Sequence, residues 1–304
     1  MRLRFNNPFK AEGDWHRGNL HTHTVHSDGK ATTEDHVTAY GKKGYSFLAI
    51  TDHGKYIDTR KFSRNDFLMI QGSEVSVGTN SSGNFYHVIA LGVGEEIPVV
   101  EANPDESPQR VIDLINREHG LPIIAHPYWS GHEFEELWEL KGYYGIEVYN
   151  HVCELLNDRG ESMVHWDALL SRNRKPFGIA TDDTHNRNLN GMPSDYYGGW
   201  INVKSPELNE GSIIECIKKG FFYSSSGPEI KDIKIEDDTV SVETSPVQKI
   251  AFITMPCRGR CFKTRGKPLN HASYSTIPGD RYVRVQITDF QGNRAWSNPI
   301  FIFT

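Results

Sequence analysis

The chain has 304 residues, of which 37% are hydrophobic and 11% aromatic, and its formal net charge at pH 7 is −6. This length suits one large domain, or a large and a small one, and the charge supplies no general attraction to nucleic acid. The first residues, MRLRFNNPFK, contain no apolar signal core, and nowhere do about 18 apolar residues run together. We therefore expect no signal peptide, no membrane span and a cytoplasmic location. Four cysteines are too few for a disulfide scaffold.

The first half of the sequence begins with a histidine-rich segment and continues with two helix and strand pairs. The segment GNLHTHT alternates, which predicts a strand with His21 and His23 on one face. A helix capped by Thr32 or Thr33 precedes the apolar run YSFLAI. A second helix starts at Pro108 and precedes the run LPIIA. By itself, the histidine pair fits either a metal site or a solvated polar loop.

Two more buried strands are predicted at YYGIEVYN and KPFGIA, with a helix in SMVHWDALLSRN between them. Strands that alternate with helices predict a parallel α/β sheet or barrel. In such folds, chemistry collects at the carboxyl ends of the strands. Imidazole and carboxylate side chains follow five of the apolar runs: His21, His23, Asp52, His53, Glu74, His126, Asp183 and His185. This repetition favours a metal cluster over unrelated solvated residues. His87 instead begins its apolar run.

The pattern changes after Gly227 and Pro228. Short alternating segments, IKDIKIED, TVSVETS, KIAFITM and YVRVQITDF, predict a small antiparallel β sandwich, with the domain boundary near residue 228. Cys257 and Cys261 lie in a basic stretch with only His271 nearby, too few ligands for structural zinc. We expect a solvated turn with free thiols; the alternative is an anion-binding loop over the barrel mouth.

The ordered motifs HTHTVHSDG, ITDHG, GSEVS, FYHVIALG, IIAHP and TDDTH, within residues 15–225, resemble the PHP (polymerase and histidinol phosphatase) family of metal-dependent phosphoesterases. The segments GFFYSSSGPEI and YVRVQITDFQGNRAWSNPIFI resemble the branch named after carbaryl hydrolase, whose members carry a small β domain. The resemblance implies an α/β fold with a distorted (β/α)7 barrel in residues 1–228 and a sandwich-like all-β domain in 229–304. It also implies two or three divalent metal ions at the open end of the barrel.

The resemblance further implies which side chains bind each ion. The first metal would be held by His21, His23, Glu74 and Asp183. Glu74 would bridge to a second metal, held also by His87 and His126. The third metal would be held by His53, His185 and Asp28, with His26 as the alternative to Asp28. Asp183 is preferred to its neighbour Asp182 because Asp-x-His is the family spacing. Because imidazoles outnumber carboxylates, the ligand set suits Zn, Mn or Fe.

The expected function is hydrolysis of a small organic phosphate or nucleotide by a metal-bridging hydroxide, with Glu74, Asp183 and His185 as the catalytic residues. His185 or Asp183 would manage the leaving-group proton. Arg187 and His151 are candidates for contacting the substrate. A carbamate or carboxylic ester hydrolase with the same site is the chemical alternative, and pocket arginines or an apolar pocket would separate the two. A metal-stabilised binding module without catalysis is the third. Neither a membrane nor a nucleic acid, other than a nucleotide substrate, is expected as a partner.

Overall fold

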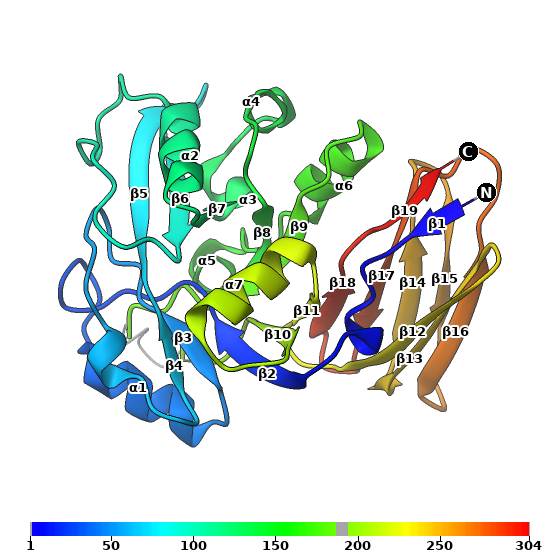
Figure 1. Cartoon of the computed structure of the whole chain (residues 1–304). Helices are drawn as coiled ribbons and strands as arrows, with labels where there is room; N and C mark the ends of the chain where they lie inside the picture. The colour runs from blue at the N-terminus through cyan, green and yellow to red at the C-terminus, as the bar shows by residue number, and fades with distance from the viewer. Residues whose placement is uncertain (1, 187–193, 304) are drawn as a thin grey trace.

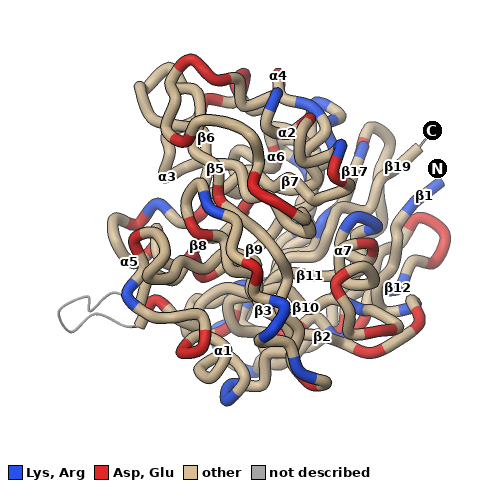
Figure 2. The backbone as a smooth tube through the Cα atoms, turned by 60° about the vertical axis from the view of Figure 1, so that its left-hand side comes forward, with Lys and Arg blue, Asp and Glu red and all other residues tan. Residues whose placement is uncertain are grey.

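The computed structural model describes residues 2–186 and 194–303 (Figure 1). Its α/β part occupies the left and centre of Figure 1, and a β-rich part with both chain ends occupies the right. No helix in the described part of the chain is long and apolar enough to span a membrane. In the view of Figure 2, Lys and Arg are interspersed with Asp and Glu along the backbone.

One sheet of the α/β part carries the histidine-rich segment at its end. Its β2–β3 and β3–β4 pairs are parallel, whereas β10 runs antiparallel between β2 and β11. The strands are β2 (Asp14–Asn19), β3 (Phe47–Ala49), β4 (Leu68–Ile70), β10 (Trp200–Ser205) and β11 (Phe222–Ser225). The expected strand at GNLHTHT is wrong beyond its first residues, because β2 ends at Asn19 and Thr22 makes only an isolated bridge with Thr184.

The second sheet has five strands in the order β5-β6-β7-β8-β9. They are β5 (Gly72–Thr79), β6 (Phe85–Leu91), β7 (Leu121–Ile124), β8 (Gly145–Asn150) and β9 (Phe177–Thr181). The pair β5–β6 is antiparallel, as expected for strands joined by a short turn. The pair β6–β7 is also antiparallel, although a helix lies between these strands in the chain. The pairs β7–β8 and β8–β9 are parallel, as the sequence predicted.

In the α/β part, the backbone pairing of the described strands places them in two different sheets, so the closed (β/α)7 barrel is not confirmed. The two sheets nevertheless meet along two seams. At one seam, β4 leads directly into β5 through Gln71. At the other, the Ser224 hydroxyl accepts from the amide of Ala180 (3.2 Å) and donates to the carbonyl of Gly178 (2.7 Å). A side chain there takes the place of ladder hydrogen bonds.

The helices cover the sheets with apolar faces. The longer ones are α1 (Thr33–Lys42), α2 (Pro108–Arg117), α6 (Met163–Ser171) and α7 (Glu210–Lys219). The short ones are α3 (Pro127–Ser130), α4 (Phe134–Glu139), α5 (His151–Asn157), and the 3-10 turns η1 (Pro8–Lys10) and η2 (Arg60–Phe62). As predicted, α1 begins with a capping box, in which Thr32 and Asp35 bond reciprocally. The helix α2 buries Val111, Ile112 and Ile115.

The C-terminal part is a pair of packed β layers. One layer is the antiparallel sheet β12-β13-β16, and the other is formed by β14, β15, β17, β18, β19 and β1. The strands are β12 (Ile230–Glu236), β13 (Thr239–Val247), β14 (Lys249–Ile253), β15 (Gly259–Lys263), β16 (Leu269–Ser275), β17 (Tyr282–Thr288), β18 (Arg294–Ser297), β19 (Ile300–Phe303) and β1 (Arg2–Arg4). Their shared core includes Ile233, Val242, Ile250 and Val285.

Two pairings tie the C-terminal layers to the rest of the chain. The strand β18 pairs with β11, so the second layer continues into the first sheet of the α/β part. The strand β1 pairs with β19, which places the first residues beside the last ones. The division at residue 228 therefore stays a prediction. Cys257 and Cys261 are exposed free thiols, as expected, and Arg258 between them bonds the carbonyl of Pro278.

Candidate metal centre

The side chains singled out by the sequence converge at one end of the α/β part. Most of them lie just beyond a strand: His21 and His23 after β2, His53 after β3, His126 after β7, and Asp183 and His185 after β9. Glu74 and His87 instead lie within β5 and β6, which run side by side. Two non-glycine members of this set, His126 and Asp183, have positive φ angles of 25° and 53°. Such strain is held by surrounding contacts and is frequent at functional sites.

His21, His23 and Asp183 form one group with metal-binding geometry, and Glu74 approaches both imidazoles of this group. The Nε2 atoms of His21 and His23 are 3.1 Å apart, and each lies 3.1 Å from Glu74 Oε2. Asp183 Oδ1 lies 3.2 Å from His21 Nε2 and 3.1 Å from His23 Nε2. In a tetrahedron with metal–ligand bonds of about 2.0–2.1 Å, donors are roughly 3.3–3.4 Å apart. The separations are therefore close to those that a single divalent ion requires.

Glu74 reaches a second group of imidazoles with its other oxygen. Glu74 Oε1 lies 2.9 Å from His87 Nδ1 and 3.2 Å from His126 Nε2. His53 Nδ1 lies 3.3 Å from Glu74 Oε2, so His53, Glu74 and His87 also form a group with metal-binding geometry. The carboxylate of Glu74 is almost fully buried and lies between the two groups, which is the position of a bridging ligand.

A third group contains His23, Asp28, His53 and His185. The Asp28 carboxylate lies 3.2 Å from His185 Nε2 and 3.9 Å from His53 Nε2. The His26 side chain is exposed and belongs to none of the groups found among the described residues. Between the two alternatives that the sequence left open, the structure brings only Asp28 to the cluster.

The electrostatics of the cluster follow from burying acids and bases together. Burial alone would lower the pKa of His23, but its contacts with Asp183 and Glu74 raise that pKa to about 9. The pKa of His21 is raised for the same reason. Burial alone would lower this pKa, and among the acids that raise it Asp183 contributes most. Burial alone would raise the pKa of Asp183, but the surrounding imidazoles, His21 first, lower it. The pocket thus stabilises positive charge among ionised carboxylates.

The donor set fits a metal by its chemistry as well as its spacing. Asp183 Oδ1 is buried and makes no hydrogen bond among the described residues, while Oδ2 accepts from Asn150. An oxygen held in this way, facing two imidazole nitrogens, has a lone pair available for a cation. Mixed nitrogen and carboxylate donors suit Zn, Mn or Fe.

Glu147 is an important residue of the site that sequence reasoning missed. Its carboxylate is fully buried and accepts from His21 Nδ1 (2.8 Å) and the Thr181 hydroxyl (2.6 Å) on one oxygen. The other oxygen accepts from the His126 amide and Asn150 Nδ2, both at 2.8 Å. A bond from Nδ1–H to a carboxylate leaves Nε2 of His21 free to face the metal position. The available signal was an acid inside the apolar run GIEVYN.

Two neighbouring aspartates have supporting positions. Asp52 accepts from the amide and hydroxyl of Thr24, both at 2.7 Å, and thereby holds the segment after His23. Asp182 accepts from the Tyr40 hydroxyl (2.6 Å) and from three successive backbone amides, those of residues 197 to 199. Its oxygens therefore have partners away from the cluster, unlike Asp183 Oδ1.

A cavity of about 90 Å³ opens onto the candidate metal ligands. Its other wall is apolar and consists of Trp129, Val152, Cys153 and Leu156. No lysine or arginine of the described chain lines it. Trp129 lines this cavity, whereas its neighbour Tyr128 does not.

Two candidate substrate contacts are not seen in this cavity. His151 is not a lining residue; its ring lies 3.0 Å from the Tyr149 hydroxyl and 3.2 Å from the carbonyl of Ser194. Arg187 lies outside the described residues. His36 and His132 belong to none of the candidate metal-binding groups found among the described residues. Both are buried, and burial lowers their pKa values, to about 4 and about 3.

The chain belongs to the PHP domain family, whose model matches residues 19–197, more than half of the chain. It is 33% identical over 69 residues to the DNA polymerase/3'-5' exonuclease PolX of Bacillus subtilis, covering 23% of this chain and 12% of that protein. It is 29% identical over 126 residues to an uncharacterized protein of Methanocaldococcus jannaschii, covering 37% of this chain and 68% of that protein. The match to the polymerase thus spans only a small part of its length.

Among solved structures, the chain is similar to a two-domain protein from Bacteroides vulgatus that contains a predicted PHP-like metal-dependent phosphoesterase. The TM-score is 0.51 at 16% identity, and the match covers 91% of each chain. At this identity the likeness concerns the fold, and it extends across both parts of the molecule. The assignment to the branch named after carbaryl hydrolase stays a prediction.

Proposed function

We propose that this protein is a metal-dependent phosphoesterase that hydrolyses a small organic phosphate. The observation that carries the proposal is the convergence of His21, His23, Glu74 and Asp183, with Glu74 reaching a second imidazole group through its other oxygen. Bound Zn, Mn or Fe ions, two or three in number, would supply a water of lowered pKa as nucleophile and neutralise charge on the phosphoryl oxygens.

The residues of the chain would hold the ions and transfer the proton of the leaving group. In this proposal, His21, His23, Glu74, His87, His126 and Asp183 hold the first two ions, and Asp28, His53 and His185 hold the third. His185 Nδ1 donates to the carbonyl of Asp183 (2.8 Å), which fixes the ring so that Nε2 faces Asp28 and the cavity. His185 or Asp183 would manage the proton of the leaving group.

The cavity supports a substrate with a compact apolar leaving group. Trp129 and Leu156, both partly exposed, form a wall opposite the carboxylates and imidazoles. A planar or branched apolar group fits beside them, whereas a highly charged one meets no cation from the described lining residues. The second candidate function, hydrolysis of a carbamate or carboxylic ester at the same centre, is favoured by this same apolar wall. The first is preferred for its agreement with the family.

A substrate panel separates the candidates. The purified protein, reconstituted with Mn or Zn, is assayed with an aryl phosphate, an aryl phosphodiester and an aryl ester or carbamate. Under the proposal, a phosphate substrate has the highest kcat/KM, and elemental analysis finds at least two transition-metal ions per chain. Turnover of the ester or carbamate alone would establish the second candidate. Fewer than one ion per chain after reconstitution would contradict both.

A further inference from the structure

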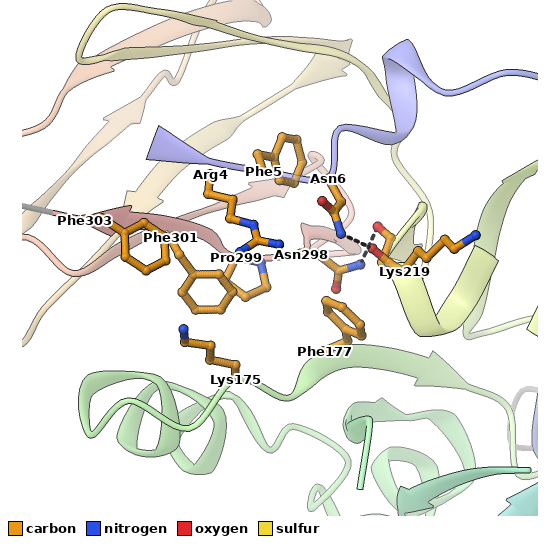
Figure 3. Close-up of a pocket in the computed structure, with 11 residues that line it drawn as sticks. Arg4, Phe5, Asn6, Lys175, Phe177, Lys219, Asn298, Pro299, Phe301 and Phe303 are labelled. Carbon is orange, nitrogen blue, oxygen red and sulfur yellow. Dashed lines mark hydrogen bonds between the residues drawn. The ribbon is translucent and has the colours of Figure 1, made fainter. Parts of the chain in front are cut away.

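A second cavity lies between the α/β part and the C-terminal layers, away from the metal centre. Its volume is about 280 Å³. Figure 3 shows that its walls come from four segments distant in sequence: the residues after β1, the start of β9, the end of α7, and β19. Phe177 begins β9, whereas Asp183 follows the opposite end of the same strand. Six residues of extended chain span roughly 20 Å, so the two cavities are separate.

The inner surface of this cavity is apolar. Phe177 and Phe301, both half-buried, form two aromatic walls of the cavity. Pro299 also lines it. Small-molecule sites are mostly apolar hollows with a few placed polar groups, and they commonly lie where two parts of a protein meet. Aromatic walls of this kind favour a ligand with a flat ring.

The rim is cationic. Arg4 and Lys175 lie at the opening, and among the described residues neither is ion-paired to a carboxylate. Lys219 borders the cavity with its backbone carbonyl, which accepts from Asn6 Nδ2, and its side chain extends away from the cavity (Figure 3). The ammonium of Lys175 lies 5.0 Å from the ring centre of Phe301 and 5.3 Å from that of Phe303. These cation–π contacts hold the Lys175 charge beside the aromatic wall. Two cations without a carboxylate partner at one opening attract an anion.

Asn298 supplies a separate polar feature inside the cavity. It is 2% exposed, and its Nδ2 donates to the carbonyls of Gly220 (3.2 Å) and Phe222 (3.0 Å). Those two carbonyls fix the orientation of the amide, because a flipped amide would place its oxygen against them. Asn298 Oδ1 then has no hydrogen-bond partner among the described residues. A buried acceptor without a partner is costly, and a donor on a ligand would satisfy it.

We propose that this cavity is a binding site for a small aromatic anion that carries a ring N–H or amino donor and one carboxylate or phosphate group. The ring lies between Phe177 and Phe301, the donor meets Asn298 Oδ1, and the anionic group meets Lys175 and Arg4. The site does not depend on the proposed phosphoesterase activity. Because its walls come from both parts of the molecule, an occupant joins them and raises thermal stability.

Three related probes test the site by calorimetry on the intact protein. Indole-3-acetate has the ring, the N–H and the carboxylate; naphthalene-1-acetate lacks the N–H; 3-methylindole lacks the anion. The expected result is one saturable site for indole-3-acetate, with the other two probes at least about fivefold weaker and Tm raised by indole-3-acetate. Equal affinities for all three, or no saturable binding, would overturn the proposal.

Variants locate the bound probe. The double variant Arg4→Gln/Lys175→Gln should bind indole-3-acetate about 3- to 10-fold more weakly, since exposed charges contribute modestly. Lys267→Gln, an equally exposed lysine of the C-terminal part, is the matched control and should leave the affinity unchanged. If Trp129→Ala abolishes binding while the Arg4→Gln/Lys175→Gln variant binds normally, the probe occupies the metal-site cavity and the proposed site is refuted.

Discussion

Replacing Glu147 by glutamine should weaken metal binding by changing which nitrogen of His21 carries the proton. The glutamine has nearly the same shape, but its amide nitrogen must face one of the two donor pairs that Glu147 now accepts from. The glutamine nitrogen cannot face the His126 amide and Asn150 Nδ2, because both of these groups are hydrogen-bond donors. Asn150 cannot turn its amide to accept, because Asn150 Oδ1 accepts from the Cys153 amide and Nδ2 also donates to Asp183.

The new amide therefore turns toward His21 Nδ1 and the Thr181 hydroxyl. The hydroxyl can rotate and accept, but His21 Nδ1 can accept only if the ring proton moves to Nε2. That nitrogen is the one 3.1 Å from Glu74 and 3.2 Å from Asp183, where the first ion would bind. The substitution thus places a proton in the position of the metal.

Losing an outer carboxylate of this kind costs about 10- to 100-fold in metal affinity, or roughly 1.4–2.7 kcal/mol. The measurement is competition for Mn or Zn against a coloured chelator, with aryl phosphate turnover followed at increasing metal. Turnover of Glu147→Gln should recover largely at saturating metal. Thr181→Val removes one donor but keeps the carboxylate and should show a smaller loss.

The exposed Glu139→Gln is the matched control, since it makes the same chemical change away from the cluster. A folded Glu147→Gln protein, judged by its circular dichroism and Tm, that binds metal as tightly as the wild type would refute the reasoning. So would an affinity loss of equal size in Glu139→Gln.

Glu74→Ala should lower aryl phosphate turnover by roughly 100-fold or more and reduce bound metal, because the one carboxylate contacts two groups of candidate metal ligands. The exposed control His119→Ala should change neither turnover nor bound metal. In the metal-free protein the raised pKa of His23 adds stability that is complete below pH 6.5 and disappears as the pH rises through about 9. Metal binding near pH 7 should consequently release protons, which a pH indicator can measure. Activity should fall on acidification, and added Mn or Zn should move this fall to lower pH. A fall in activity that does not depend on the metal concentration would contradict this. Burial lowers the pKa of His36 to about 4, so protonation of this residue opposes folding as the pH falls below 6.5. His36 alone should lower the unfolding free energy of the metal-free protein by about 2 kcal/mol between pH 7 and 5. The variant His36→Asn should show a correspondingly flatter pH dependence in urea unfolding.

The sequence alone determined features that depend on neighbouring residues. Local patterns of capping and apolar residues predicted the helix cap at Thr32 and several strands: β3, β7, β8, β9, β12, β13, β14 and β17. The candidate ligands were also recognisable, because a polar residue at the end of an apolar run is a local signal whatever the strand order. Membership of the PHP family was predicted from these motifs and is confirmed.

Tertiary structure alone decided which distant segments meet. The antiparallel β6–β7 pair and the pairing of β1 with β19 have no local signature, because ladder hydrogen bonds form between backbones and are indifferent to side-chain type. Glu147 and Asn298 are ordinary polar residues in the sequence. Their roles arise because folding buries them beside donors or carbonyls contributed by remote parts of the chain, and a buried polar atom must take whatever partner the fold brings to it.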